Sequence, residues 1–175
     1  MFVYKIKPNK TEISRYDYHR IVESMFSKSL FHILDDGMLI VLTEDSNPNQ
    51  SYDGSIVLEK EILDLSFLKE SSVFYFTVDV YAQCLIDNKL RSVPKDKVTD
   101  WMLNKLQESG FEVMNIETSF LGCKLEQISK NKNCPTPINR FCGYLKIVDE
   151  LKAIEAIRNG FGKRKHLGLG FLRLF

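Results

Sequence analysis

Tyr16 and His19 are the residues whose types and spacing best suit chemistry in this sequence. They stand in the stretch Tyr16-Asp-Tyr-His19-Arg20, which opens a segment with helical spacing of apolar residues. Because positions three residues apart share one face of a helix, the phenol and the imidazole can converge on one substrate atom. Imidazole can accept or donate a proton near neutral pH, and Arg15 and Arg20 place positive charge nearby. The alternative is a half-exposed helix histidine with no chemical role.

A second concentration of useful residues lies at the C-terminus. Residues 158–175 contain four of the nine glycines and neither Asp nor Glu. Glycine lets a backbone approach a ligand closely, and clustered Lys and Arg attract phosphates. This glycine-rich run is therefore predicted to grip a polyanion backbone, with a turn carrying solvated charges as the alternative. The prediction rests on Gly160, Gly162, Gly168, Gly170, Arg158, Lys163, Arg164, Lys165 and Arg173.

The other two histidines are weaker candidates. His32 lies in an apolar strand of an expected hairpin, so a structural or surface role is expected. His166 lies in the glycine-rich run beside three cations. It could contact a base or a phosphate, but a passive place in the loop is the favoured alternative.

Near a phosphate, a histidine such as His19 could move a proton from a ribose 2′-hydroxyl or to a 5′-oxygen leaving group, and lysines could stabilise the developing charge.

Other site chemistries fit the sequence poorly. It contains neither a phosphate-binding Gly-x-x-x-x-Gly-Lys-Ser/Thr motif nor a Gly-x-Gly-x-x-Gly motif. Its cysteines form no Cys-x-x-Cys pair, so a zinc site is not expected, and reduced thiols are. The acidic residues form no clear cluster. We therefore expect no metal and no cofactor.

Bulk composition is that of a globular protein with one domain or two small ones: 175 residues, 44% hydrophobic and 27% charged. The net charge is +1, so nucleic-acid binding would have to come from local basic patches. The N-terminus does not resemble a signal peptide, and no apolar run is long enough to cross a membrane. A cytoplasmic location is expected.

Periodicity and turn signals predict an α+β fold. The N-terminal part is expected to contain a strand at 2–7, a helix at 16–26 capped by Ser14, hairpin strands at 30–34 and 38–43, a loop at 45–54 and a short strand at 56–59. This is most of a βαββαβ unit whose second helix is reduced or lost.

The C-terminal part reads as a second βαββαβ unit. Its expected elements are a strand at 73–86, a helix at 100–109, β structure at 111–125, an exposed loop at 129–140, a strand at 141–147, a helix at 149–158 and a final strand at 167–175. The predicted fold is two tandem ferredoxin-like (RRM-like, βαββαβ) units, the first degenerate. The expected ranges are 1–60 with the helix of His19, a connector at 61–72, and 73–175 with the glycine-rich run.

Three blocks carry a family resemblance. The first runs from Tyr16 to Phe26, with Tyr-x-x-His at its start. In the second, a long strand leads through Lys89-Leu-Arg91-Ser-Val-Pro94 into a helix with a tryptophan. The third is Phe141-Cys-Gly-Tyr-Leu-Lys-Ile, a helix, and then the glycine-rich run. Together the blocks resemble the CRISPR-associated endoribonuclease CasE family, the guide-RNA-processing subunit of the type I-E Cascade complex.

The resemblance implies a metal-independent endoribonuclease that binds a repeat stem-loop. Cleavage at the stem base by the 2′-hydroxyl would give 2′,3′-cyclic phosphate and 5′-hydroxyl ends. By position, His19 corresponds to the catalytic histidine, Tyr16 to its partner and Lys165 to the lysine of the glycine-rich loop. The implied partners are CRISPR repeat RNA and other Cascade subunits, with a monomer when free.

Basic residues elsewhere are candidate RNA contacts, although each could equally be solvated surface: Arg20, Lys89, Arg91, Lys95, Lys97, Lys130, Lys132 and Arg140. Two other functions stay open. One is a non-catalytic RNA-binding subunit that caps the guide RNA stem-loop in a Cascade-like ribonucleoprotein. The other is a ferredoxin-like module for protein interaction.

Overall fold

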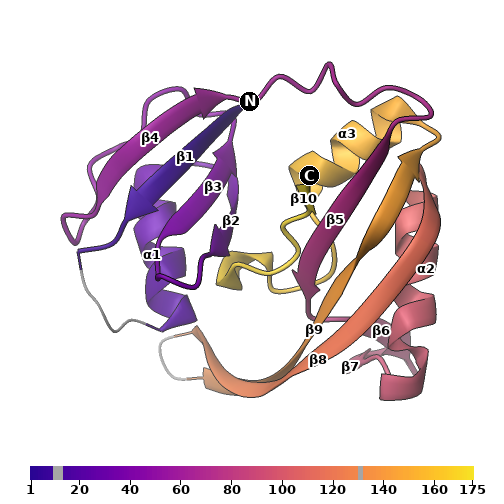
Figure 1. Cartoon of the computed structure of the whole chain (residues 1–175). Coiled ribbons are helices and arrows are strands. Elements are labelled where there is room, and N and C mark those ends of the chain that lie inside the picture. Colours follow the sequence, from indigo (N-terminus) through magenta and orange to yellow (C-terminus); the bar gives the residue numbers. More distant parts are fainter. Residues whose placement is uncertain (10–13, 130–131) are drawn as a thin grey trace. The chain divides into compact units, whose positions relative to one another are not determined.

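The computed structural model describes residues 1–9, 14–129 and 132–175, and the chain divides into two compact units (Figure 1). The first unit holds Met1–Asp64, Leu125–Cys134 and Lys165–Gly168, and the second unit holds Leu65–Lys124, Pro135–Arg164 and Leu169–Phe175. Two short segments of the C-terminal half thus belong to the first unit, whereas the sequence led us to expect contiguous ranges at 1–60 and 73–175. The functional roles assigned to those ranges stay predictions.

The first unit has the strand order of a ferredoxin-like fold. Its elements are β1 (Phe2–Lys7), α1 (Arg15–Met25), β2 (Ser29–Ile33), β3 (Leu39–Thr43), β4 (Ile56–Ile62) and the short helix η2 (Lys165–Leu167). The sheet order is β2-β3-β1-β4, with antiparallel neighbours. The chain passes from β3 to β4 without a second helix, so the degenerate first unit is confirmed. Strand β4 extends to Ile62, beyond the expected range 56–59.

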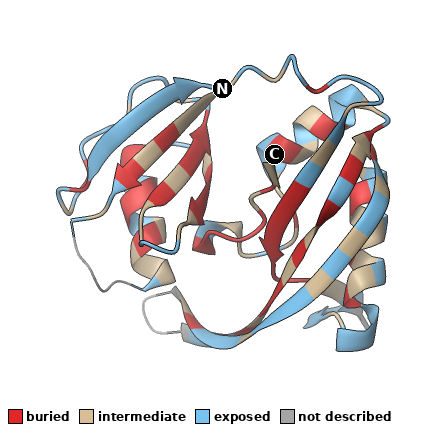
Figure 2. Cartoon of the chain, viewed as in Figure 1, coloured by how far each residue is buried: buried red, intermediate tan, exposed pale blue. Residues whose placement is uncertain are grey.

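One face of α1 packs on this sheet. The buried side chains of Tyr18, Ile21, Val22 and Met25 repeat at three- and four-residue intervals, which puts them on one helix face. They share one core with strand residues Tyr4, Ile6, Phe31, Leu39 and Val41. Figure 2 shows the buried residues of α1 and the sheet in red. Burial of each large apolar side chain contributes about 1.5–3 kcal/mol to stability. This core therefore fixes the rotation of α1 about its axis, which leaves Tyr16 and His19 partly exposed.

The second unit is a complete ferredoxin-like fold with an inserted hairpin. Its elements are β5 (Val73–Val80), β6 (Gln83–Ile86), β7 (Lys89–Ser92), η1 (Lys95–Lys97), α2 (Val98–Glu108), β8 (Phe111–Ser129), β9 (Lys132–Ile147), α3 (Glu150–Asn159) and β10 (Arg173–Leu174). The last residues of β8 and the first residues of β9, within Leu125–Cys134, belong to the first unit. The sheet order is β10-β5-β9-β8, and β6 pairs with β7 outside it. The predicted α+β fold with two ferredoxin-like units is therefore confirmed.

One strand prediction and one loop prediction in this half were wrong. The strand expected over 73–86 is broken between Val80 and Gln83, where β5 ends and the β6–β7 hairpin begins. The loop expected over 129–140 is mostly strand β9. The prolines there suggested a loop, but Thr136 and Ile138 are almost fully buried. Ile138 packs in a cluster with Tyr81 and Leu169, and this burial favours the strand over a solvated loop.

The final strand expected over 167–175 was also wrong, because only Arg173–Leu174 forms β10. Gly168 and Gly170 have φ values of +74° and +81°, in the left-handed region that a regular strand does not contain. Leu167 lies in η2 instead. The apolar residues that suggested a strand are buried all the same, since Leu167, Leu169 and Leu172 are at most 5% exposed.

Candidate active site on helix α1

A capping box fixes the start of helix α1 and with it the candidate residues. The Ser14 side chain accepts a hydrogen bond from the backbone N–H of Asp17 at 3.2 Å, and the backbone N–H of Ser14 donates to the Asp17 carboxylate at 3.1 Å. Such a cap stabilises a helix by about 1 kcal/mol. Tyr16 and His19 follow in the first turns, both half-buried, with ring centroids 6.2 Å apart. Their spacing predicted that the two rings share one helix face, and their convergence on a substrate atom stays a prediction.

His19 also has a carboxylate partner on its own helix. His19 Nε2 lies 3.5 Å from Glu23 Oε2, one turn further along α1. The His19 side chain is 23% exposed and that of Glu23 67% exposed, so the contact lies at the surface. A carboxylate there orients the imidazole and places negative charge beside it. Glu23 was missed from the sequence, although its i+4 spacing from His19 was a usable signal.

Helix η2 brings part of the glycine-rich run against α1 within the first unit. The rings of His19 and His166 lie 5.1 Å apart between centroids, with 58° between their planes. Arg15 Nη1 donates a hydrogen bond to the backbone carbonyl of Leu167 at 2.8 Å. Lys165, half-buried, is the first residue of the same short helix. The structure thus brings together candidate residues from the two ends of the sequence.

Arg15 also pairs with a residue of the β8–β9 hairpin. Its Nε lies 3.3 Å from Glu126 Oε1, and the side chains are only 20% and 9% exposed. The pKa of the nearby Tyr18 phenol is raised above its ordinary value, chiefly by burial, and the positive charge of Arg15 only partly offsets that rise. The sequence indicated Arg15 only as nearby charge, and nothing in the sequence around Glu126 signals this ion pair. Arg15 and Glu126 therefore support helices α1 and η2 through the ion pair and the hydrogen bond to Leu167.

Gly168 allows η2 to lie close to strand β2. A Cβ built on Gly168 would meet Phe31 Cε2 at 2.8 Å and Ile33 Cγ1 at 3.4 Å. Phe31 belongs to the core beneath α1, so it has little room to move. The backbone N–H of Gly168 also donates to the carbonyl of Lys165 at 3.0 Å, closing the turn. The structure therefore gives Gly168 a packing role, and its predicted contact with RNA stays a prediction.

Most other residues of the run lie in the second unit. Arg164 has a φ of +59°, its guanidinium lies 4.4 Å above the Tyr81 ring centroid, and it donates to the Thr136 hydroxyl. The backbone N–H of Lys163 donates to the Tyr81 carbonyl at 3.4 Å, while its side chain is exposed. Arg164 thus has structural contacts that the sequence did not predict. Its predicted RNA contact, like that of Lys163, stays a prediction.

Gly160, Gly162 and Gly170 have structural roles in the second unit, and Arg158 lies on its helix α3. Gly160 ends α3, and its N–H donates to the Ala156 carbonyl at 2.7 Å. A Cβ on Gly162 would meet Val80 Cγ1 at 2.5 Å, and one on Gly170 would collide with the Phe161 backbone. Arg158 is exposed in the last turn of α3. The RNA contacts predicted for these four residues stay predictions.

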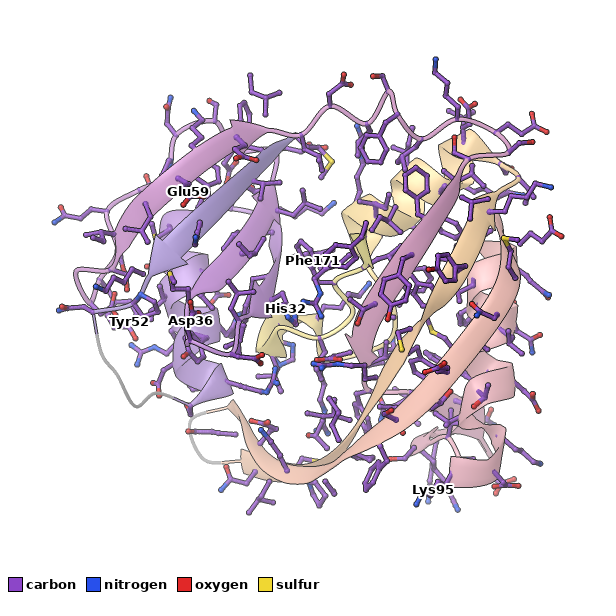
Figure 3. All side chains as sticks on the ribbon, viewed as in Figure 1. His32, Asp36, Tyr52, Glu59, Lys95 and Phe171 are labelled. Atoms are coloured by element: carbon purple, nitrogen blue, oxygen red, sulfur yellow. The ribbon has the colours of Figure 1, made fainter. Side chains whose placement is uncertain are left out.

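Four basic residues lie on the inserted hairpin and on the short helix η1 that follows it in the second unit. Lys89 and Arg91 lie on β7, and Lys95 and Lys97 lie on η1, all exposed. Lys95, labelled in Figure 3, has its Nζ 5.2 Å from the Phe120 ring centroid. The structure thus gathers four predicted contacts on neighbouring segments.

Two further predictions concern single basic residues. Arg140 forms a two-bond ion pair with buried Asp79, at 2.7 and 2.9 Å, so a structural role accounts for its place. Lys130 lies outside the described residues.

Arg20 and His32 lie on α1 and β2 of the first unit. The guanidinium of Arg20 lies 4.9 Å from the centroid of the Tyr52 ring, labelled in Figure 3. His32 is 6% exposed on β2, which agrees with the structural role expected for it. Among the described residues, no three His, Cys, Asp or Glu side chains form a group that could hold a metal ion. No helix there is long and apolar enough to cross a membrane.

Solved structures similar to this chain share its fold. A CRISPR endoribonuclease Cse3 bound to a 19-nucleotide RNA matches with a TM-score of 0.82 and 19% identity, over 100% of both chains. The CRISPR-associated protein Cas6e from Escherichia coli K-12 matches with a TM-score of 0.79 and 18% identity, over 99% of this chain and 98% of that one. A chain of a CRISPR RNA-guided surveillance complex matches with a TM-score of 0.76 and 16% identity, over 99% and 98%.

No curated protein sequence matches the chain. A family described as CRISPR associated protein matches residues 5–175. This match covers nearly all of the chain and confirms the kinship that the three sequence blocks indicated. The chain therefore belongs to the family of CRISPR-associated proteins.

Proposed function

We propose that this chain is an endoribonuclease that processes CRISPR repeat RNA. It binds a repeat stem-loop and cleaves at the base of the stem by attack of a 2′-hydroxyl, which leaves a 2′,3′-cyclic phosphate and a 5′-hydroxyl. The observation that carries the proposal is the meeting of α1, with Tyr16 and His19, and η2, with Lys165, in one compact unit. Similarity to an RNA-bound CRISPR endoribonuclease supports it.

Each residue has a role that suits its chemistry. His19 transfers a proton to or from the reacting oxygens. Tyr16, on the same helix face, holds the phosphate or the ribose through its hydroxyl. The ammonium group of Lys165 offsets the charge that develops on the phosphate in the transition state. These groups act without a metal ion in the proposed reaction.

Cleavage of the repeat RNA from the CRISPR array beside the gene tests the proposal. With enzyme in excess and EDTA present, the wild-type chain is expected to cut at one bond and to leave a cyclic phosphate. His19→Ala is expected to abolish cleavage while RNA affinity stays nearly unchanged. Lys28→Ala, an exposed substitution elsewhere in the first unit, is the matched control and should cleave normally. Undiminished cleavage by His19→Ala would contradict the assignment.

A second candidate is a non-catalytic subunit that caps the guide RNA stem-loop in a Cascade-like ribonucleoprotein. Similarity to a chain of an RNA-guided surveillance complex favours assembly with other subunits in either case. Tight RNA binding by the wild-type chain without cleavage would favour the cap. Absence of RNA binding at moderate salt would favour a module for protein interaction. In each case we expect a monomer when the chain is free.

A further inference from the structure

Two imidazoles meet in the candidate active site. The His19 and His166 rings are 5.1 Å apart between centroids and tilted by 58°. His166 is exposed, and the His19 side chain keeps 23% of its surface exposed. Both rings are thus open to solvent on neighbouring elements of one unit. A phosphodiester bound there can lie within reach of both rings.

The backbone on either side of His166 is held in place. Before it, the Lys165 carbonyl accepts the hydrogen bond from the N–H of Gly168. After it, the Leu167 carbonyl accepts the hydrogen bond from Arg15, and Leu167 itself is fully buried. His166 therefore projects from an anchored turn, which suits a group that must meet a substrate atom in a defined position.

The surrounding charges differ for the two rings. Besides the two histidines, the charged and titratable groups on the elements packed here are Arg15, Tyr16, Asp17, Tyr18, Arg20 and Glu23 on α1, Glu126 at the end of β8, Lys165 on η2 and His32 on β2. The Glu23 carboxylate lies beside His19, whereas the residue next to His166 is Lys165. A carboxylate partner suits the ring that gives a proton to the leaving group, and this contact distinguishes His19 from His166.

We infer that His166 is a second catalytic residue, the general base of the cleavage, and that His19 is its general acid. The inference rests on the proposed function. His166 takes the proton of the 2′-hydroxyl as the 2′ oxygen bonds to phosphorus. His19 gives its proton to the 5′ oxygen as the P–O5′ bond breaks. One proton is taken and one is given, so exchange with water restores the pair, and no oxidant, reductant or other reactant is needed.

The pH profile of single-turnover cleavage tests the base. The wild-type rate on the repeat RNA is expected to rise and then fall with pH. His166→Ala should cleave roughly 10²- to 10⁴-fold more slowly and should lose the limb that rises with pH, with little change in RNA affinity. Imidazole added to the buffer should restore part of the rate. Lys28→Ala, the control, should keep the wild-type profile.

A sulfur-substituted substrate tests the division of roles. With sulfur in place of the bridging 5′ oxygen at the mapped bond, the leaving group departs as a thiolate and needs no acid. His19→Ala should then recover most of its lost rate, and His166→Ala should recover none. Recovery by His166→Ala instead would overturn the assignment of base and acid.

The outcomes separate the two proposals. If the wild-type chain cleaves and His166→Ala matches it in rate and pH profile, the role of His166 is overturned alone. If the wild-type chain binds the repeat RNA and does not cleave it, the proposed function is overturned, and this inference with it. Circular dichroism of His166→Ala checks that the exposed substitution leaves the fold intact.

Discussion

The guanidinium of Arg15 ties the backbone of Leu167 to the carboxylate of Glu126. Nη1 donates to the Leu167 carbonyl at 2.8 Å, and Nε lies 3.3 Å from Glu126 Oε1. Arg15 begins the helix that carries His19, and Leu167 follows His166. One side chain thus holds helix α1, helix η2 and the end of strand β8 together, and the spacing of the two imidazoles depends on it.

Arg15→Ala should reduce both stability and cleavage. It leaves the Glu126 carboxylate, whose side chain is 9% exposed, without its ion-pair partner. Breaking a buried pair in this way costs about 3–5 kcal/mol in the free energy of unfolding, measurable by urea denaturation. Arg20→Ala is the matched control for stability, because Arg20 is exposed and its guanidinium lies over the Tyr52 ring rather than in a buried ion pair. It should cost no more than about 1 kcal/mol.

Arg15→Met combined with Glu126→Leu should separate stability from positioning. Replacing both partners of a buried ion pair by apolar groups is often neutral or stabilising. The double variant should regain most of the stability lost in Arg15→Ala. Its single-turnover cleavage rate should stay low, because no guanidinium holds the Leu167 carbonyl. If the rate returned with the stability, Arg15 would have no positioning role.

Gly168→Ala should displace η2. The added methyl would lie 2.8 Å from Phe31 Cε2, and the backbone would keep a φ of +74°. Gly54→Ala is the matched control: φ is +79°, and the nearest atom lies at 3.5 Å. The control should lose only the cost of the left-handed backbone, about 1–2 kcal/mol, and should cleave normally. Gly168→Ala should lose more stability and cleavage, and equal losses in the two variants would contradict the packing argument.

Arg164→Ala and Lys163→Ala should differ in their effects on RNA binding. The guanidinium of Arg164 lies over Tyr81, whereas the Lys163 side chain is exposed. Lys163→Ala should reduce the salt dependence of RNA affinity by about one phosphate contact. Arg164→Ala should chiefly lower the Tm, since a cation–π contact of this kind is worth about 0.5–1 kcal/mol. The opposite pattern in a salt titration would assign the RNA contact to Arg164.

The cap of helix α3 should make stability depend on pH. The Asp149 carboxylate accepts a hydrogen bond from the backbone N–H of Lys152 at 3.1 Å, and this bond lowers the pKa of Asp149. A lowered folded-state pKa adds stability above the ordinary carboxyl pKa, and that stability is lost as the pH falls through the lowered value. Asp149→Ala should therefore lower the Tm at neutral pH but much less in acid. Asp149→Asn, which retains the cap, should lose less at neutral pH.

Much of the fold and part of the site follow from local sequence patterns. The capping box of Ser14, the buried face of α1 and the facing of Tyr16 and His19 depend on residues three or four positions apart. The Asp-Gly hairpin between β2 and β3 likewise depends on neighbours. Such features were predictable, and the order of these elements was enough to indicate two ferredoxin-like units.

Tertiary packing decided the rest. Residues 132–140 form a strand because Thr136 and Ile138 are buried, which outweighs the loop tendency of the prolines beside them. Residues 167–172 leave the extended conformation because Gly168 and Gly170 take positive φ against Phe31 and the Phe161 backbone. The contacts of Arg15 with Glu126 and Leu167, and of His19 with His166, join residues far apart in the chain. The sequence by itself determined which residues could do chemistry, but only the folded chain decided which of them meet, because no local pattern records a long-range contact.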